Sequence, residues 1–156
     1  WGVALANYET ATGTFPALAE YPDGATGDAW SVPARLLVYV EQENLQRLAD
    51  TAQSYVAPAN RVVMGYRVPI LVCPSEPNDR KRPDGTHPDG SPKEHYPLNY
   101  AANAGTWFVY QPAGSGPGTP GDGAFQVNRP LRVAGIADGL SNTVGMAEVK
   151  AFTPYF

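Results

Sequence analysis

The chain has 156 residues, a length that suits one globular domain over residues 1–156. Its net charge is −4, and 17% of its residues are charged. No basic stripe is present to neutralise a run of phosphates, so nucleic-acid binding is not expected. No apolar run reaches 18 residues, so the chain as given is not expected to span a membrane. Sixteen glycines and sixteen prolines predict long loops, while the many aromatic residues favour a folded core over disorder.

Residues 1–12 are predicted to form the end of a helix. The residues from Val3 to Tyr8 are mostly apolar, and Gly13 is suited to the left-handed position that ends a helix. The chain opens on helix-like residues without a starting Met or a signal peptide. We therefore expect this helix to be truncated, with its upstream part missing from the sequence.

A second helix is predicted from Ser31 to about Tyr55. Ser31 can cap its first turn and Pro33 suits that turn. Its expected buried face consists of Leu37, Leu45, Leu48 and Ala52.

Short strands are predicted in the rest of the chain. Arg67–Cys73 is rich in branched residues, and a long polar loop with six prolines follows at 74–97. The other strand candidates are Leu98–Asn103, Trp107–Tyr110, Ala124–Val127, Leu131–Val133 and Thr143–Val149. Helices followed by strands without helical crossovers predict an α+β fold, with both helices packed on a mainly antiparallel sheet.

The first helix is expected to bury its apolar face, from Val3 to Tyr8, against this sheet. The sheet residues expected beneath it are Ile70, Val72, Val144 and Met146. Each fully buried aliphatic side chain would contribute about 1.5–3 kcal/mol.

Acidic residues provide one candidate metal site. Asp122, Asp138 and Glu148 would lie together if the late strands end at the same edge, and calcium prefers such oxygen ligands. No other cofactor is expected. The loop residues Asp84, His87, Asp89, Glu94 and His95 match no zinc spacing and are interpreted as turns.

The segment Asp138-Gly139-Leu140-Ser141-Asn142-Thr143 has two interpretations. A nucleophile elbow would need glycine where Thr143 stands and a later histidine, whereas both histidines come earlier in the chain. A turn at Asp138-Gly139, with Ser141 and Asn142 bonding to its backbone, fits better. We therefore expect no enzymatic activity.

Aromatic residues and the single cysteine complete the candidates. Trp30, Trp107 and Tyr110 would line a groove if the protein binds a solute or glycan, or would fill the core if it does not. Cys73 has no partner for a disulfide in this chain and is expected to be a small buried apolar residue.

Four sets of residues occur in a characteristic order along nearly the whole chain. They are Gly2–Tyr8 with Gly13–Pro16; Trp30–Gln42; Val68–Pro77; and Asn99–Thr106 with Asp122–Phe125, Ile136–Thr143 and Glu148. Together they resemble the planctomycete-type pseudopilin-like family of exported bacterial proteins, described as a domain of unknown function and also as a solute-binding family. Two family features are absent here: the prepilin-type leader with its long apolar helix, and a C-terminal His-x9-Asp-Gly motif.

The resemblance implies a structural subunit of a type II secretion or pilus-like assembly. The domain would lie in the periplasm, anchored to the inner membrane by the missing helix, which would also contact other pilin-like subunits. Some family members carry a cysteine in that helix, so the resemblance also implies a disulfide between the missing segment and Cys73. The alternative function is an extracytoplasmic solute- or glycan-binding module.

Overall fold

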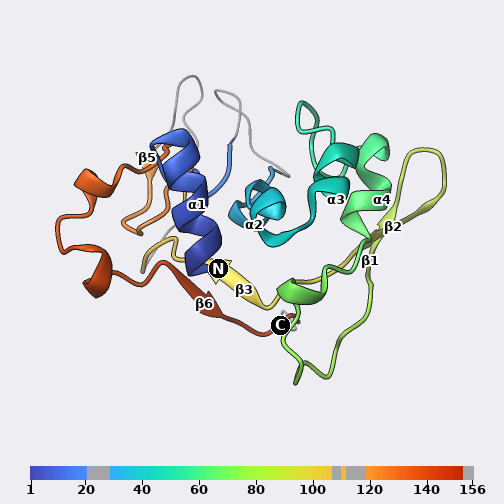
Figure 1. The fold of residues 1–156 in the computed structure, drawn as a ribbon. Coiled ribbons are helices and arrows are strands. Elements are labelled where there is room, and N and C mark those ends of the chain that lie inside the picture. The colour runs from blue at the N-terminus through green and yellow to red at the C-terminus, as the bar shows by residue number, and fades with distance from the viewer. Residues whose placement is uncertain (21–28, 107–109, 112–118, 153–156) are drawn as a thin grey trace.

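The computed structural model describes residues 1–20, 29–106, 110, 111 and 119–152 (Figure 1). The helices in these residues are α1 (Gly2–Thr12), α2 (Val32–Arg35), α3 (Glu43–Leu48) and α4 (Arg61–Met64). The strands are β1 (Arg82–Thr86), β2 (Pro92–His95), β3 (Tyr100–Ala102), β4 (Tyr110–Gln111), β5 (Thr119–Pro120) and β6 (Met146–Glu148). They pair as three two-stranded antiparallel sheets, β1–β2, β3–β6 and β4–β5, which confirms the α+β class and the antiparallel pairing.

Helix α1 ends as predicted. Gly13 has φ 77°, and its N–H donates to the Glu9 carbonyl at 2.7 Å. The expected buried face was wrong in part, because Val3 is 75% exposed and Ala4 is the fully buried residue of this helix. A small alanine lets the helix backbone approach its neighbours closely.

The sheet β3–β6 joins the two strand candidates at 98–103 and 143–149. Its register pairs Tyr100 with Glu148 and Ala102 with Met146. Helix α1 reaches this sheet through Trp1, whose ring centre lies 5.9 Å from that of Tyr100.

The sheet residues expected beneath α1 lie elsewhere. Ile70 is 51% exposed and Val144 is 63% exposed, so neither forms a buried contact surface for the helix. Val72 is buried, but outside the cluster that packs on α1, and Met146 is half-buried.

The second helix is broken into shorter pieces. Helix α2 is followed by a 3₁₀ turn at Leu37–Val40, then by Glu41 in the left-handed region with φ 62°, and then by α3. Leu37 and Leu45 are buried as expected, whereas Leu48 is 59% exposed. The two buried leucines on either side of the break, Leu37 and Leu45, belong to the same core cluster.

Three other strand predictions were wrong. Arg67–Cys73 contains a 3₁₀ turn at Pro69–Leu71, where proline has no N–H for a ladder. Ala124–Val127 and Leu131–Val133 contribute only isolated bridges, Gln126 to Arg129 and Leu131 to Phe15. Most of Trp107–Tyr110 lies outside the described residues.

A hairpin occupies the segment predicted to be a long loop at 74–97. Strands β1 and β2 pair Arg82 with His95 and Pro83 with Glu94, and the register shifts between Pro83 and Thr86. Such an irregularity accommodates a strand proline.

The core consists of two clusters. The first contains Ala4, Val32, Leu36 and Phe125, and the second contains Leu37, Leu45, Val68 and Leu71. Trp1 packs against both clusters. Figure 1 shows α2 between α1 on one side and α3 with α4 on the other, so the two clusters lie on either side of α2.

Within the described ranges, no helix is both long enough and apolar enough to cross a membrane.

Candidate functional site

A cavity of about 620 Å³ lies between the helical segments and the β1–β2 hairpin. Its floor is the second core cluster, formed by Leu37, Leu45, Val68 and Leu71. Its volume falls in the usual range for small-molecule sites, roughly 300–1,000 Å³, and such sites are mostly apolar with a few polar groups.

One wall of the cavity is aromatic. Trp30 is only 8% exposed, and its ring Nε1–H donates to the Gln53 carbonyl at 2.9 Å. Tyr55 meets Trp30 edge to face with ring centres 6.3 Å apart, and His95 lies 5.5 Å from Tyr55. These contacts fix the orientation of the Trp30 ring in the wall.

A charged group borders this aromatic wall. Asp84 Oδ2 lies 2.8 Å from both Lys93 Nζ and His95 Nε2. The hydrogen bond from Lys93, followed by that from His95, lowers the pKa of Asp84 to about 2. Asp84 is therefore ionised at neutral pH, and its charge is compensated within the hairpin.

Arg82 also lines the cavity, at the start of β1. Its guanidinium carbon lies over the Phe152 ring, 5.0 Å from the ring centre. Within the residues that the structure places, no carboxylate pairs with this guanidinium. Arg82 therefore adds a positive charge that no described acidic side chain neutralises.

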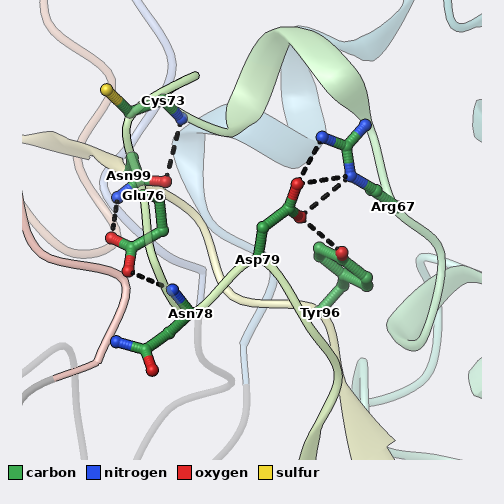
Figure 2. A network of polar contacts seen from close by, with 7 residues as sticks. All are labelled: Arg67, Cys73, Glu76, Asn78, Asp79, Tyr96 and Asn99. Carbon is green, nitrogen blue, oxygen red and sulfur yellow. Dashed lines mark hydrogen bonds and ion pairs between the residues drawn. The ribbon is translucent and has the colours of Figure 1, made fainter.

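Two polar networks hold the segments that surround the cavity (Figure 2). In the first, Arg67 Nη2 donates to Asp79 Oδ2 at 2.6 Å, and Arg67 Nε donates to both carboxylate oxygens. The Tyr96 hydroxyl donates to Asp79 Oδ1 at 2.5 Å. Arg67, then Tyr96, lower the pKa of Asp79 to about 2, and the same carboxylate raises the pKa of Tyr96.

The second network is centred on Asn99, which is 2% exposed. Its Oδ1 accepts from the Cys73 N–H at 2.9 Å, and its Nδ2 donates to Glu76 Oε2 at 2.8 Å and to the Val149 carbonyl at 3.0 Å. Glu76 Oε2 also accepts from the Ala151 N–H at 3.2 Å. The bonds to Glu76 from Asn99, from the Asn78 N–H and from the Ala151 N–H lower its pKa, and the network ties three distant segments together.

Cys73 does not have the buried environment predicted for it. It is half-buried, and its Sγ lies 3.1 Å from the Ser75 hydroxyl. Figure 2 shows the sulfur pointing away from Asn99. The disulfide to an upstream segment remains a prediction.

The structure does not bring the predicted calcium ligands together. Asp122 accepts from the Thr106 N–H at 2.9 Å and from its hydroxyl at 2.7 Å, which lowers the pKa of Asp122. Asp138 lies in a turn and Glu148 lies in β6. Among the described residues, no three His, Cys, Asp or Glu side chains are placed to hold a metal ion.

The turn interpretation of residues 138–143 agrees with the geometry in most respects. Gly139 has φ 78°, and Asn142 Nδ2 donates to the Asp138 carbonyl at 2.9 Å. The second side-chain bond comes from the Thr143 hydroxyl, which donates to the Gly139 carbonyl at 3.1 Å, and not from Ser141 as predicted.

Of the three predicted aromatic ligand residues, Trp30 lines the cavity. Trp107 lies outside the described residues, and only the backbone of Tyr110, in β4, is described. Sequence reasoning missed Tyr55 and Arg82 as cavity residues and interpreted Asp84 and His95 only as turn residues. Lys93, Glu94 and His95 are all polar, so the sequence shows no apolar alternation that would have indicated a strand there.

A family model described as "Protein of unknown function (DUF1559)" matches residues 1–156. No curated protein and no solved structure matches the chain.

Proposed function

The chain belongs to the DUF1559 family of proteins of unknown function, and from that premise we propose that it is a non-enzymatic, pseudopilin-like subunit of a type II secretion or pilus-like assembly. In this proposal the domain is periplasmic and is anchored to the inner membrane by a helix upstream of α1. Other pilin-like subunits are its partners.

The outer face of α1 carries this proposal. Its exposed residues include Val3, Ala6, Asn7 and Thr10, which share one helix face, and none of the exposed residues of α1 is charged. A solvent-facing helix normally presents charged side chains on that face. Small, uncharged residues instead allow a second helix to approach closely, as a bundle of subunits requires.

Site-specific crosslinking tests this proposal in the native organism with the protein as its own gene encodes it. In a Cys73→Ser background, Ala6→Cys is expected to form a disulfide-linked dimer with another subunit on mild oxidation. Thr51→Cys, at an exposed turn outside α1, is the matched control and should stay monomeric. Equal crosslinking at both positions would contradict a specific helix interface.

The histidine environments support a non-enzymatic role. His95 bonds to Asp84, and the buried ring Nε2 of His87 has no hydrogen-bond partner in the part of the chain that the structure describes. Among the described residues, neither histidine is hydrogen-bonded to a serine, threonine or cysteine side chain that it could activate.

The cavity favours a second candidate function, the binding of a small solute. Trp30, Tyr55 and the leucine floor provide apolar surface, while Arg82 and the Asp84 group provide polar contacts. Thermal unfolding against a panel of sugars, amino acids, organic acids and calcium tests it. A ligand that binds only the folded state raises the midpoint, and a flat response across the panel would argue against solute binding.

A further inference from the structure

We propose that the cavity beside Trp30 takes a small molecule with an apolar body and a single carboxylate, and that Arg82 binds this carboxylate. The inference rests on the second proposed function, solute binding at the same cavity. It adds the chemical class of the solute.

The apolar character of the ligand is inferred from the side chains that form the floor and the aromatic wall of the cavity. Leu37, Leu45, Val68 and Leu71 are each at most 6% exposed and offer no polar side-chain atom. The Trp30 ring donates its only N–H to Gln53, so the ring offers the cavity no remaining donor. A sugar would leave hydroxyl groups unpaired against these surfaces, which disfavours its binding there.

The carboxylate follows from the charges at the edge of the cavity. Asp84 is already bonded to Lys93 and His95, so it has little attraction left for a ligand cation. The charges of Asp84 and Lys93 cancel, and Arg82 leaves one positive charge in excess.

The position of Arg82 leaves its donors available. A guanidinium has five N–H donors in its own plane. The Phe152 ring, 5.0 Å from the guanidinium carbon, has no acceptor oxygen, and no carboxylate among the described residues bonds to Arg82, so its N–H donors can meet a ligand carboxylate. Arginine binds carboxylates through two parallel hydrogen bonds, which neither an alcohol nor an amine can reproduce.

Calorimetric titration at pH 7 with matched probes tests the proposal. The probes are 2-naphthylacetate, 2-(2-naphthyl)ethanol and 2-(2-naphthyl)ethylamine, which share one aromatic body, and octanoate, which replaces this body with an aliphatic one. We expect 2-naphthylacetate to bind at least tenfold more tightly than the alcohol, and the amine to bind most weakly. The ratio of octanoate to 2-naphthylacetate affinity distinguishes fatty acids from aromatic acids as the source.

Two variants isolate the role of the guanidinium. Arg82→Gln should remove the tenfold preference for the carboxylate while leaving the affinity for the alcohol unchanged, which also reports an intact cavity. Arg80→Gln is the control, because Arg80 is exposed and lies just before β1. This variant should leave the affinities for 2-naphthylacetate and for the alcohol unchanged.

The outcomes distinguish a failure of solute binding from a failure of the carboxylate assignment. If no probe binds the unaltered protein, both solute binding and this inference are wrong. If the alcohol binds as tightly as the acid, or Arg82→Gln leaves the preference intact, solute binding stands and the carboxylate assignment is overturned.

Discussion

Leu36 and Leu37 are consecutive residues, yet their side chains are buried in different core clusters. Leu36 packs with Ala4 and Phe125, while Leu37 packs with Leu45 and Leu71 in the floor of the cavity. Consecutive residues of a helical segment project about 100° apart, so the segment that runs from α2 into the 3₁₀ turn directs these two side chains to different sides. This short segment therefore joins the part of the core beneath α1 to the part that shapes the candidate site.

Truncating Leu37 should weaken both the fold and the cavity. Leu37 is 4% exposed, so Leu37→Ala is expected to lower the free energy of unfolding by about 2–5 kcal/mol. Urea denaturation measures this change. Val38→Ala, at a side chain that is 48% exposed, is the control and should stay within about 0.5 kcal/mol of the unaltered protein.

Replacing Asn99 should loosen the contact between the segment at 73–76 and the end of the chain. Asn99→Asp keeps the acceptor for the Cys73 N–H but removes the donors to Glu76 and Val149, and sets two carboxylates against each other. We expect a loss of about 1–3 kcal/mol in unfolding free energy.

Hydrogen exchange of the Val149 and Ala151 amides should locate the effect of Asn99→Asp. Faster exchange at these two amides is expected, because Val149 N–H donates to the Asn99 backbone and Ala151 N–H donates to Glu76. Unchanged exchange there would mean that the network does not hold this segment.

Acid should destabilise the protein through Asp79. Its folded-state pKa, about 2, lies below the unfolded value of about 3.9. The ionised form is therefore favoured by folding, so its contribution is complete above about pH 4 and disappears as pH falls towards 2. Urea midpoints at pH 6, 4 and 2.5 should fall in that order.

Replacing Arg67, the ion-pair partner of Asp79, measures how much of the stability loss at low pH comes from Asp79. Arg67 is the main cause of the lowered pKa, so Arg67→Gln should be less stable at pH 6 and should lose less on acidification. An equally steep acid response in this variant would assign the effect to other carboxylates, such as Asp84.

Gly105 should tolerate no side chain. Its φ is 112°, and a Cβ there would lie 2.0 Å from Asp122 Oδ1 and 2.7 Å from the Gly123 backbone nitrogen. Gly105→Ala is expected to destabilise the fold by several kcal/mol, because both strain and overlap act at one site.

Gly13→Ala provides the matched comparison for Gly105→Ala. Gly13 also has a positive φ, 77°, but a Cβ there meets no atom within 4 Å. The expected loss is therefore only the backbone term, about 1–2 kcal/mol. Similar melting temperatures for the two variants would contradict the close approach of Gly105 to Asp122.

Local patterns predicted the elements whose signals are local. Gly13 marked the end of α1 because a left-handed residue is needed there, and the strands at Tyr100–Ala102 and Met146–Glu148 lie within predicted segments. The breaks at Glu41 and Pro69 were not predictable in this way. The leucine spacing fits a continuous helix, whereas the structure places Glu41 at φ 62° between the 3₁₀ turn and α3.

The candidate site depended even more on contacts distant in sequence. Trp30 was a candidate because of its residue type, but its partner Tyr55 lies 25 positions later in a turn. The prolines between residues 74 and 97 obscured the hairpin that brings Asp84 to Lys93 and His95. From the sequence alone, without the pairing of β1 and β2, these residues are interpreted as separate turn residues.

The position of Trp1 also bears on how the domain would respond to mechanical load. Because this ring contacts both core clusters, tension applied at the start of α1 would be shared between them from the outset. Peeling the helix away would then require both sets of contacts to shear together, rather than one after the other. In the proposed assembly, force would be applied at this N-terminal end, where contacts to both core clusters would oppose it.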